Sequence, residues 1–133
     1  MATAADITVK KADGTTDIIW SLVASSGGDN SPAVWRSNTA PGTLGQRPTF
    51  KISTRDNGNK TARRVDISGV FPSVYTNSAS GQTEVRATIP FSASFAVPQN
   101  IVTTDLNEAA AQLCNLIASA LSKSAISTGF APT

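Results

Sequence analysis

The stretch that decides the fold is TFKISTRDNGNKTARRVDI, residues 49–67. Its first half alternates Phe50 and Ile52 with polar residues at 49, 51, 53 and 55, which is the two-residue period of a half-buried strand. A hairpin turn centred on Asn57-Gly58 is expected next, and alternation then continues to Ile67. Arg63 shares parity with Val65, so alternation fails there. This indicates a bulge or a place where the sheet projects beyond its cover.

The remaining chain predicts more strands and then helices. Strands are expected at 7–10, 17–23, 33–37, 70–75 and 83–97, with Asp13-Gly14 as the first hairpin turn. Leu106, Ala110, Leu113, Ile117 and Leu121 recur on one helix face, and residues 124–128 form a short second helix before Gly129. The predicted fold is α+β, an antiparallel sheet of about six to seven strands followed by two C-terminal helices, in one domain, residues 1–133.

Composition argues against an enzyme. The 133 residues include no histidine and one cysteine, which removes the commonest general base and every Cys-His or Ser-His pair. No phosphate-binding glycine loop or metal motif is present, so neither a metal site nor another cofactor is expected. The acidic residues are scattered singly, although distant carboxylates can still meet in a fold. Apolar stretches are interrupted before they reach membrane-spanning length.

The positive charge is concentrated in one segment. Residues 47–64 carry six basic residues and one acidic residue, while the whole chain has a net charge of only +2. A local basic stripe on a nearly neutral protein is typical of a polyanion-binding face. The alternative interpretation is a solvated strand pair kept soluble by its charges.

The predicted sheet has too little cover. A helix of about 17 residues is about 25 Å long, which cannot cover six or seven strands spaced roughly 4.8 Å apart. The chain is therefore expected to dimerise, with the helices of a partner completing the cover. Core or dimer packing is the favoured interpretation for five residues, although the two tryptophans could instead stack on bases: Trp20, Trp35, Leu106, Leu113 and Ile117.

This order of elements resembles the coat proteins of the leviviruses, single-stranded RNA bacteriophages. The resemblance covers nearly the whole chain and is carried most specifically by Ala33-Val34-Trp35, by residues 49–55 and by Val65-Asp66-Ile67. It implies an interlocked homodimer that assembles into an icosahedral shell in the host bacterial cytoplasm. It also implies that the inward sheet face binds a genomic RNA stem-loop, which represses replicase translation.

The resemblance implies roles for particular residues. The RNA-facing positions correspond to Thr49, Lys51, Ser53, Arg55, Ala62, Arg64, Asp66, Arg86, Thr88 and Pro90. Well-known members have a stacking tyrosine and an asparagine where Thr88 and Pro90 stand, so base stacking is expected from elsewhere or not at all. The flexible loop 73–82 corresponds to a capsid-contact loop with Ser73, Tyr75, Asn77, Ser80 and Gly81. Tyr75 could alternatively be a displaced stacking residue.

Two other functions remain open on the sequence. One is a β-rich structural subunit of a virion or filament with no specific RNA recognition. The other is an RNA-binding regulator that does not assemble. The basic stripe favours RNA binding, and the uncovered apolar face favours assembly. Only an RNA-binding coat protein uses both features.

Overall fold

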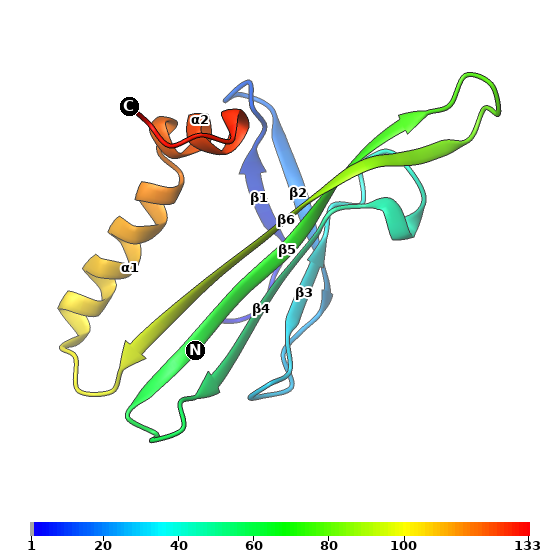
Figure 1. Ribbon diagram of the computed structural model, residues 1–133. Coiled ribbons are helices and arrows are strands. Elements are labelled where there is room, and N and C mark those ends of the chain that lie inside the picture. The colour runs from blue at the N-terminus through cyan, green and yellow to red at the C-terminus, as the bar shows by residue number, and fades with distance from the viewer. Residues whose placement is uncertain (1) are drawn as a thin grey trace. The chain divides into compact units, whose positions relative to one another are not determined.

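The computed structural model describes residues 2–133. Six antiparallel strands form one sheet in the order β1-β2-β3-β4-β5-β6, which Figure 1 shows as a twisted array. The strands are β1 (Ile7–Lys10), β2 (Asp17–Ala24), β3 (Ala33–Arg36), β4 (Thr49–Asp56), β5 (Ala62–Thr76) and β6 (Thr83–Pro98). A 3-10 turn, Leu44–Gln46, precedes β4, and the helices are α1 (Thr103–Ile117) and α2 (Ala120–Thr128). The predicted fold class is confirmed.

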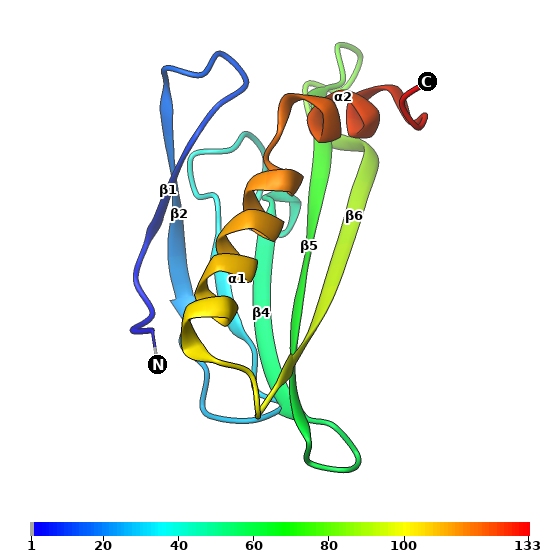
Figure 2. The ribbon, with the colours of Figure 1, turned by 90° about the vertical axis from the view of Figure 1, so that its left-hand side faces the viewer.

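The chain divides into two compact units between Ala96 and Val97, one with the sheet and one with the helices. In the second unit the expected single helix face is wrong, because the helix breaks at Ser119, whose extended backbone caps α2. Leu121 therefore lies in α2, not in α1. Figure 2 shows α1 and α2 as two separate helices. Gly129 ends α2 with φ 77°, as expected of a C-terminal glycine.

The register of the central strands defines two sheet faces. Lys51 pairs with Ser68, Ser53 with Asp66 and Arg55 with Arg64, and cross-strand partners point to the same side. We call this side the polar face. The side that carries Phe50 and Ile52 is called the apolar face. The expected alternation along residues 49–55 is confirmed.

The turn between β4 and β5 differs from the expectation. Lys60 N–H donates to Asn57 O (3.1 Å), so Gly58-Asn59 is the turn centre, not Asn57-Gly58. The Asn57 side chain accepts hydrogen bonds from the backbone of Thr61 (2.9 Å) and Ala62 (3.3 Å), which satisfies the loop and displaces the turn by one residue. The expected separate strand at 70–75 is the continuation of β5.

A small aromatic core lies on the apolar face of the sheet. Trp35 is 6% exposed, its ring centre lies 5.7 Å from that of Phe50, and Phe50 stacks on Phe91 at 6.1 Å. The Trp35 indole N–H donates to the Ala5 carbonyl (2.8 Å), which attaches the N-terminal segment to β3. Trp20, opposite Ile7, is half-buried.

Many apolar side chains have no cover in the single chain. On the sheet Val85, Ile89 and Phe91 are exposed, the last by 45%. Neither helix has a buried residue, and Leu106 is half-buried. Exposed large apolar residues of the helical unit are Val102, Leu113, Leu116, Ile117, Leu121, Ile126 and Phe130. The places of Trp20, Leu106, Leu113 and Ile117 in a dimer stay predictions, as does the single domain.

Gly69→Ala is expected to destabilise the sheet by about 1–3 kcal/mol, because an added methyl group overpacks the site. A Cβ at Gly69 would meet the Thr49 carbonyl oxygen and the Phe91 ring, whose Cε1 would be 2.6 Å away. Urea unfolding measures the change, and Gly45→Ala, where no atom lies within 4 Å, is the control. Equal stability of the two variants would contradict the close packing of β4, β5 and β6.

Candidate nucleic-acid interface

The polar face brings together the basic residues of β4 and β5. Arg55 pairs with Arg64. Lys51 lies four residues before Arg55 in β4 and pairs with Ser68. Ser53 stands opposite Asp66 between them, and Ala62 precedes Arg64 by two residues in β5. Lys51, Arg55 and Arg64 are exposed. The sequence-predicted residues of these two strands therefore share one surface.

A hydrogen-bonded network holds the centre of this face. Arg64 Nη2 donates to Ser94 Oγ (2.7 Å), which donates to Asp66 Oδ1 (2.7 Å). Arg55 Nε lies 3.4 Å from Asp66 Oδ2. The Ser94 hydrogen bond, and then the charges of Arg55 and Arg64, lower the pKa of Asp66. Asp66 therefore stays ionised and offsets Arg55, while Lys51 keeps an unpaired charge.

Arg36 is a residue of this face that sequence reasoning missed. It pairs with Thr49, so its side chain points to the same side as that of Lys51. The signal was available, because Trp35 is apolar and its neighbour in a strand must face the other way. Among β3 to β6 the polar face carries Arg36, Lys51, Arg55, Arg64 and Arg86 against Asp66 and Glu84.

Arg63 lies on the opposite, apolar face. Its Nη1 donates to Asp29 Oδ2 (2.9 Å) and to Asp56 Oδ1 (2.8 Å), and its Nη2 approaches Thr54 Oγ1 at 3.4 Å. The hydrogen bond from Arg63 lowers the pKa of Asp29, and the two carboxylates raise the pKa of Arg63. These contacts explain why a charged residue stands at an apolar position of the alternating pattern. Arg63 is paired with Asp29 in the loop before β3 and with Asp56 at the end of β4.

β6 contributes Arg86 and Thr88 to the polar face. Both share the parity of Ser94, which contacts Asp66 and Arg64 on that face. The Arg86 guanidinium carbon lies 4.9 Å from the centre of the Tyr75 ring. Thr88 is exposed and offers a hydroxyl where a ring would be needed for stacking.

Tyr75 also reaches the polar face. Its hydroxyl donates to Glu84 Oε2 (2.8 Å), and this hydrogen bond raises the pKa of Tyr75. Glu84 and Arg86, which Tyr75 contacts, share the parity of Ser94 in β6 and so belong to the polar face. Regular alternation from Val65 would place Tyr75 on the apolar face, so the alternation of β5 changes between these two residues.

The loop between β5 and β6 is shorter than expected. Ser73 and Tyr75 lie in β5, and the turn spans residues 77–82, closed by Asn77 N–H donating to Gln82 O (2.8 Å). Gly81 has φ 69°, and its N–H donates to Asn77 O (2.7 Å). Ser80 is an exposed residue of this turn. Roles of these residues in capsid contacts stay predictions.

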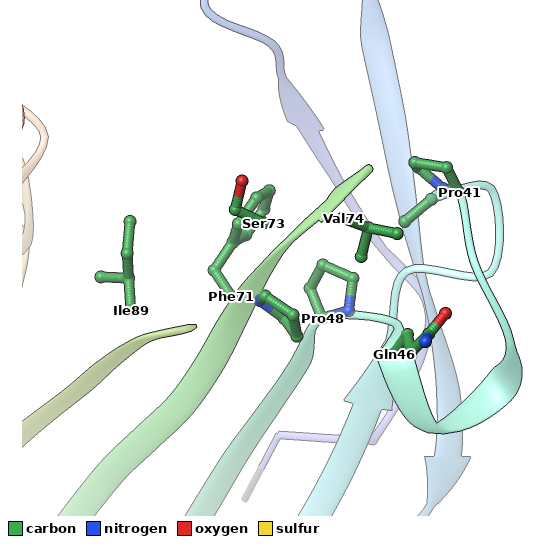
Figure 3. A pocket seen from close by; sticks show the side chains of 9 residues that line it. Pro41, Gln46, Pro48, Phe71, Ser73, Val74 and Ile89 are labelled. Carbon is green, nitrogen blue, oxygen red and sulfur yellow. The ribbon is translucent and has the colours of Figure 1, made fainter. Parts of the chain in front are cut away.

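An open apolar pocket of about 390 Å³ lies beside this end of the sheet (Figure 3). Its lining residues are Ala40, Pro41, Gln46, Pro48, Phe71, Pro72, Ser73, Val74 and Ile89. None of these side chains titrates, so the pocket supplies no general acid or base. Within residues 2–133 no three metal-binding side chains cluster. No helix in the same range is long and apolar enough to cross a membrane.

Comparison with solved structures identifies the fold. No protein-family model and no curated protein matches the sequence. The virus-like particle of Beihai levi-like virus 21 is 18% identical, with TM-score 0.79 over 99% of this chain and 98% of that one. The particle of bacteriophage NT-214 is 15% identical, with TM-score 0.79 over 99% and 100%, and the bacteriophage GA capsid protein is 21% identical, with TM-score 0.76 over 97% of each.

The class defined by this similarity is the coat-protein fold of single-stranded RNA bacteriophages. The chain has that fold along nearly its full length, which confirms the resemblance suggested by the sequence. The similar structures are virus-like particles and a capsid protein.

The neighbouring arginines are expected to respond differently to substitution. Arg63→Gln should lower the free energy of unfolding because it releases Asp29 and Asp56, whereas Arg64→Gln, on the other face, should change it by no more than about 0.5 kcal/mol. The pKa of Asp29 is depressed in the folded state, so its contribution is present above about pH 4 and is lost as the pH falls. Urea unfolding at pH 7 and pH 3 measures this. An Arg63→Gln effect that grows toward pH 3 would contradict the pairing.

Proposed function

We propose that this chain is the capsid protein of a single-stranded RNA bacteriophage, which self-assembles as dimers into an icosahedral shell and binds genomic RNA on its polar sheet face. The observation that carries the proposal is the fold similarity to virus-like particles along 99% of the chain. Such a protein would reside in the virion. Translational repression through an RNA hairpin is the finer part of the same proposal.

The exposed apolar residues support self-association. Fully burying a Leu, Ile or Phe side chain contributes about 1.5–3 kcal/mol relative to leaving it in water. Leu116 and Leu121 are 63% and 64% exposed, and Ile89 on the sheet is 58% exposed. Helices of one copy packing on the apolar sheet face of another would bury both sets. We therefore propose an obligate homodimer as the assembling unit.

The charge difference between the two faces supports RNA binding on the polar one. Among β3 to β6 the polar face has five basic residues against two acidic ones, whereas on the apolar face Arg63 is balanced by Asp56. A polyanion would gain Coulomb energy on the first face only. The inward face of the shell in this proposal is the polar face.

Expression in bacteria followed by sizing and electron microscopy tests the proposal as a whole. Closed particles that contain nuclease-protected RNA are expected, since assembly and RNA binding reside in the same chain. Empty particles would favour a structural subunit without RNA recognition, and a soluble RNA-binding dimer would favour a regulator that does not assemble. A soluble monomer would overturn the capsid and the dimer together.

The RNA-binding face is tested separately with Lys51→Ala, Arg55→Ala and Arg64→Ala. Each variant should weaken RNA binding and reduce the slope of log K against log salt by about 0.7, the value per phosphate contact for single strands. Arg55→Ala should have the smallest effect because Asp66 already offsets that charge. Filter binding at several salt concentrations measures the slopes. Unchanged slopes in all three variants would assign the stripe to solubility.

A further inference from the structure

Two arginines outside the predicted set lie at one end of the central strands. Arg36 ends β3 opposite Thr49, and the Ser37 N–H donates to Pro48 O (3.1 Å), which extends the pairing one residue further. Arg47, next to Pro48, approaches Asn38 Oδ1 with its Nη1 at 3.4 Å. The two arginine side chains therefore start from adjacent chain segments at the same end of the sheet.

Neither arginine has an acidic partner. Within residues 2–133 the ion pairs involve Lys10, Arg55 and Arg63, and no carboxylate oxygen lies within 4.0 Å of Arg36 or Arg47. In both residues Nε is buried and has no hydrogen-bond acceptor. The Nε donors of both guanidinium groups are therefore shielded from water without an acceptor from the protein, which is energetically unfavourable. Turning either guanidinium toward an external anion would break no hydrogen bond at Nε.

The position of this pair continues the basic surface. Arg36 shares the polar face with Lys51, one strand away and diagonal in the register, since Arg36 pairs with Thr49. Two residues along a strand span about 7 Å and four residues about 13 Å. Arg36 is therefore offset from Lys51 by about 7 Å along the strands, and Lys51 from Arg55 by about 13 Å. An extended polyanion could contact them in succession. An isolated small anion would gain nothing from that continuity.

We propose that Arg36 and Arg47 form a phosphate-binding subsite for the RNA backbone, which extends the polar face beyond β4 to the end of β3. The proposal rests on the RNA-binding function proposed above. Arginine fits this role because its planar guanidinium donates two parallel hydrogen bonds to phosphate oxygens. The subsite reads backbone charge and not base identity, so it strengthens binding of any single-stranded RNA.

The test titrates the full-length protein with a fluorescent oligouridylate at several salt concentrations. Arg36→Gln and Arg47→Gln should each reduce the slope of log K against log salt by about 0.7, and the double variant by about 1.4. Arg36→Lys should keep most of the slope because the charge remains. Lys123→Gln, an exposed change of equal charge in α2, should leave the slope unchanged. Electron microscopy and thermal unfolding verify that each variant folds and assembles.

The outcomes separate this inference from the proposed function. If Lys51→Ala reduces the slope while both single glutamine variants and their double variant match the parent, the subsite is overturned and the RNA-binding face stands. If neither set of variants changes the slope, the RNA-binding face fails and the subsite fails with it. If Lys123→Gln reduces the slope as much as Arg36→Gln does, the effect is one of net charge, and the subsite is again overturned.

Discussion

The pairing of β4 with β5 is the constraint on which the other features depend. The Asn57 side chain accepts hydrogen bonds from the backbone N–H groups of Thr61 and Ala62. These bonds fix the register with Asp56 opposite Arg63 and Arg55 opposite Arg64. A shift of one residue in either strand would turn all its side chains to the other face. Lys51 and Ser53 would then take the places of Phe50 and Ile52 beside the aromatic core. The burial of that core and the charge of the polar face are therefore two consequences of one register.

The separation of the sheet into an apolar and a polar face leaves many apolar side chains of the single chain without packing partners. The aromatic core buries Trp35, yet Phe91 in the same stack is 45% exposed, and α1 buries no residue. A helix of 15 residues is marginal in water unless it packs against something. Folding and self-association are consequently expected to be coupled, so that stability depends on protein concentration. The exposed apolar area alone is the reason for this expected link between folding and self-association.

The sequence predicted the faces better than it predicted the ends of elements. Alternation along residues 49–55 gave the polar face because each strand position has a fixed side. Arg36 was missed because β3 is only four residues long, so its side is marked by the neighbouring Trp35 and not by a repeated alternation. Regular alternation along β5 would have placed Tyr75 with Val65, on the wrong face. The helix break at Ser119 was hidden by apolar residues that keep helical spacing across it. The presence of Arg63 on the apolar face is explained by its hydrogen bond to Asp29, which is 34 residues away in the sequence and was therefore not predictable from local alternation.

The composition of the polar face bears on what kind of RNA recognition it supports. Tyr75 is the only tyrosine in the chain, and one side of its ring is occupied by Arg86 while its hydroxyl is bound by Glu84. Thr88 has no ring, so no free aromatic platform is added there. In the RNA complex proposed above, lysine and arginine contacts would then supply most of the binding energy, and these act on phosphates of any sequence. Asp66, kept ionised by Ser94, opposes indiscriminate binding at the centre of the face. A surface of this kind suits packaging of a whole genome better than tight selection of a single hairpin.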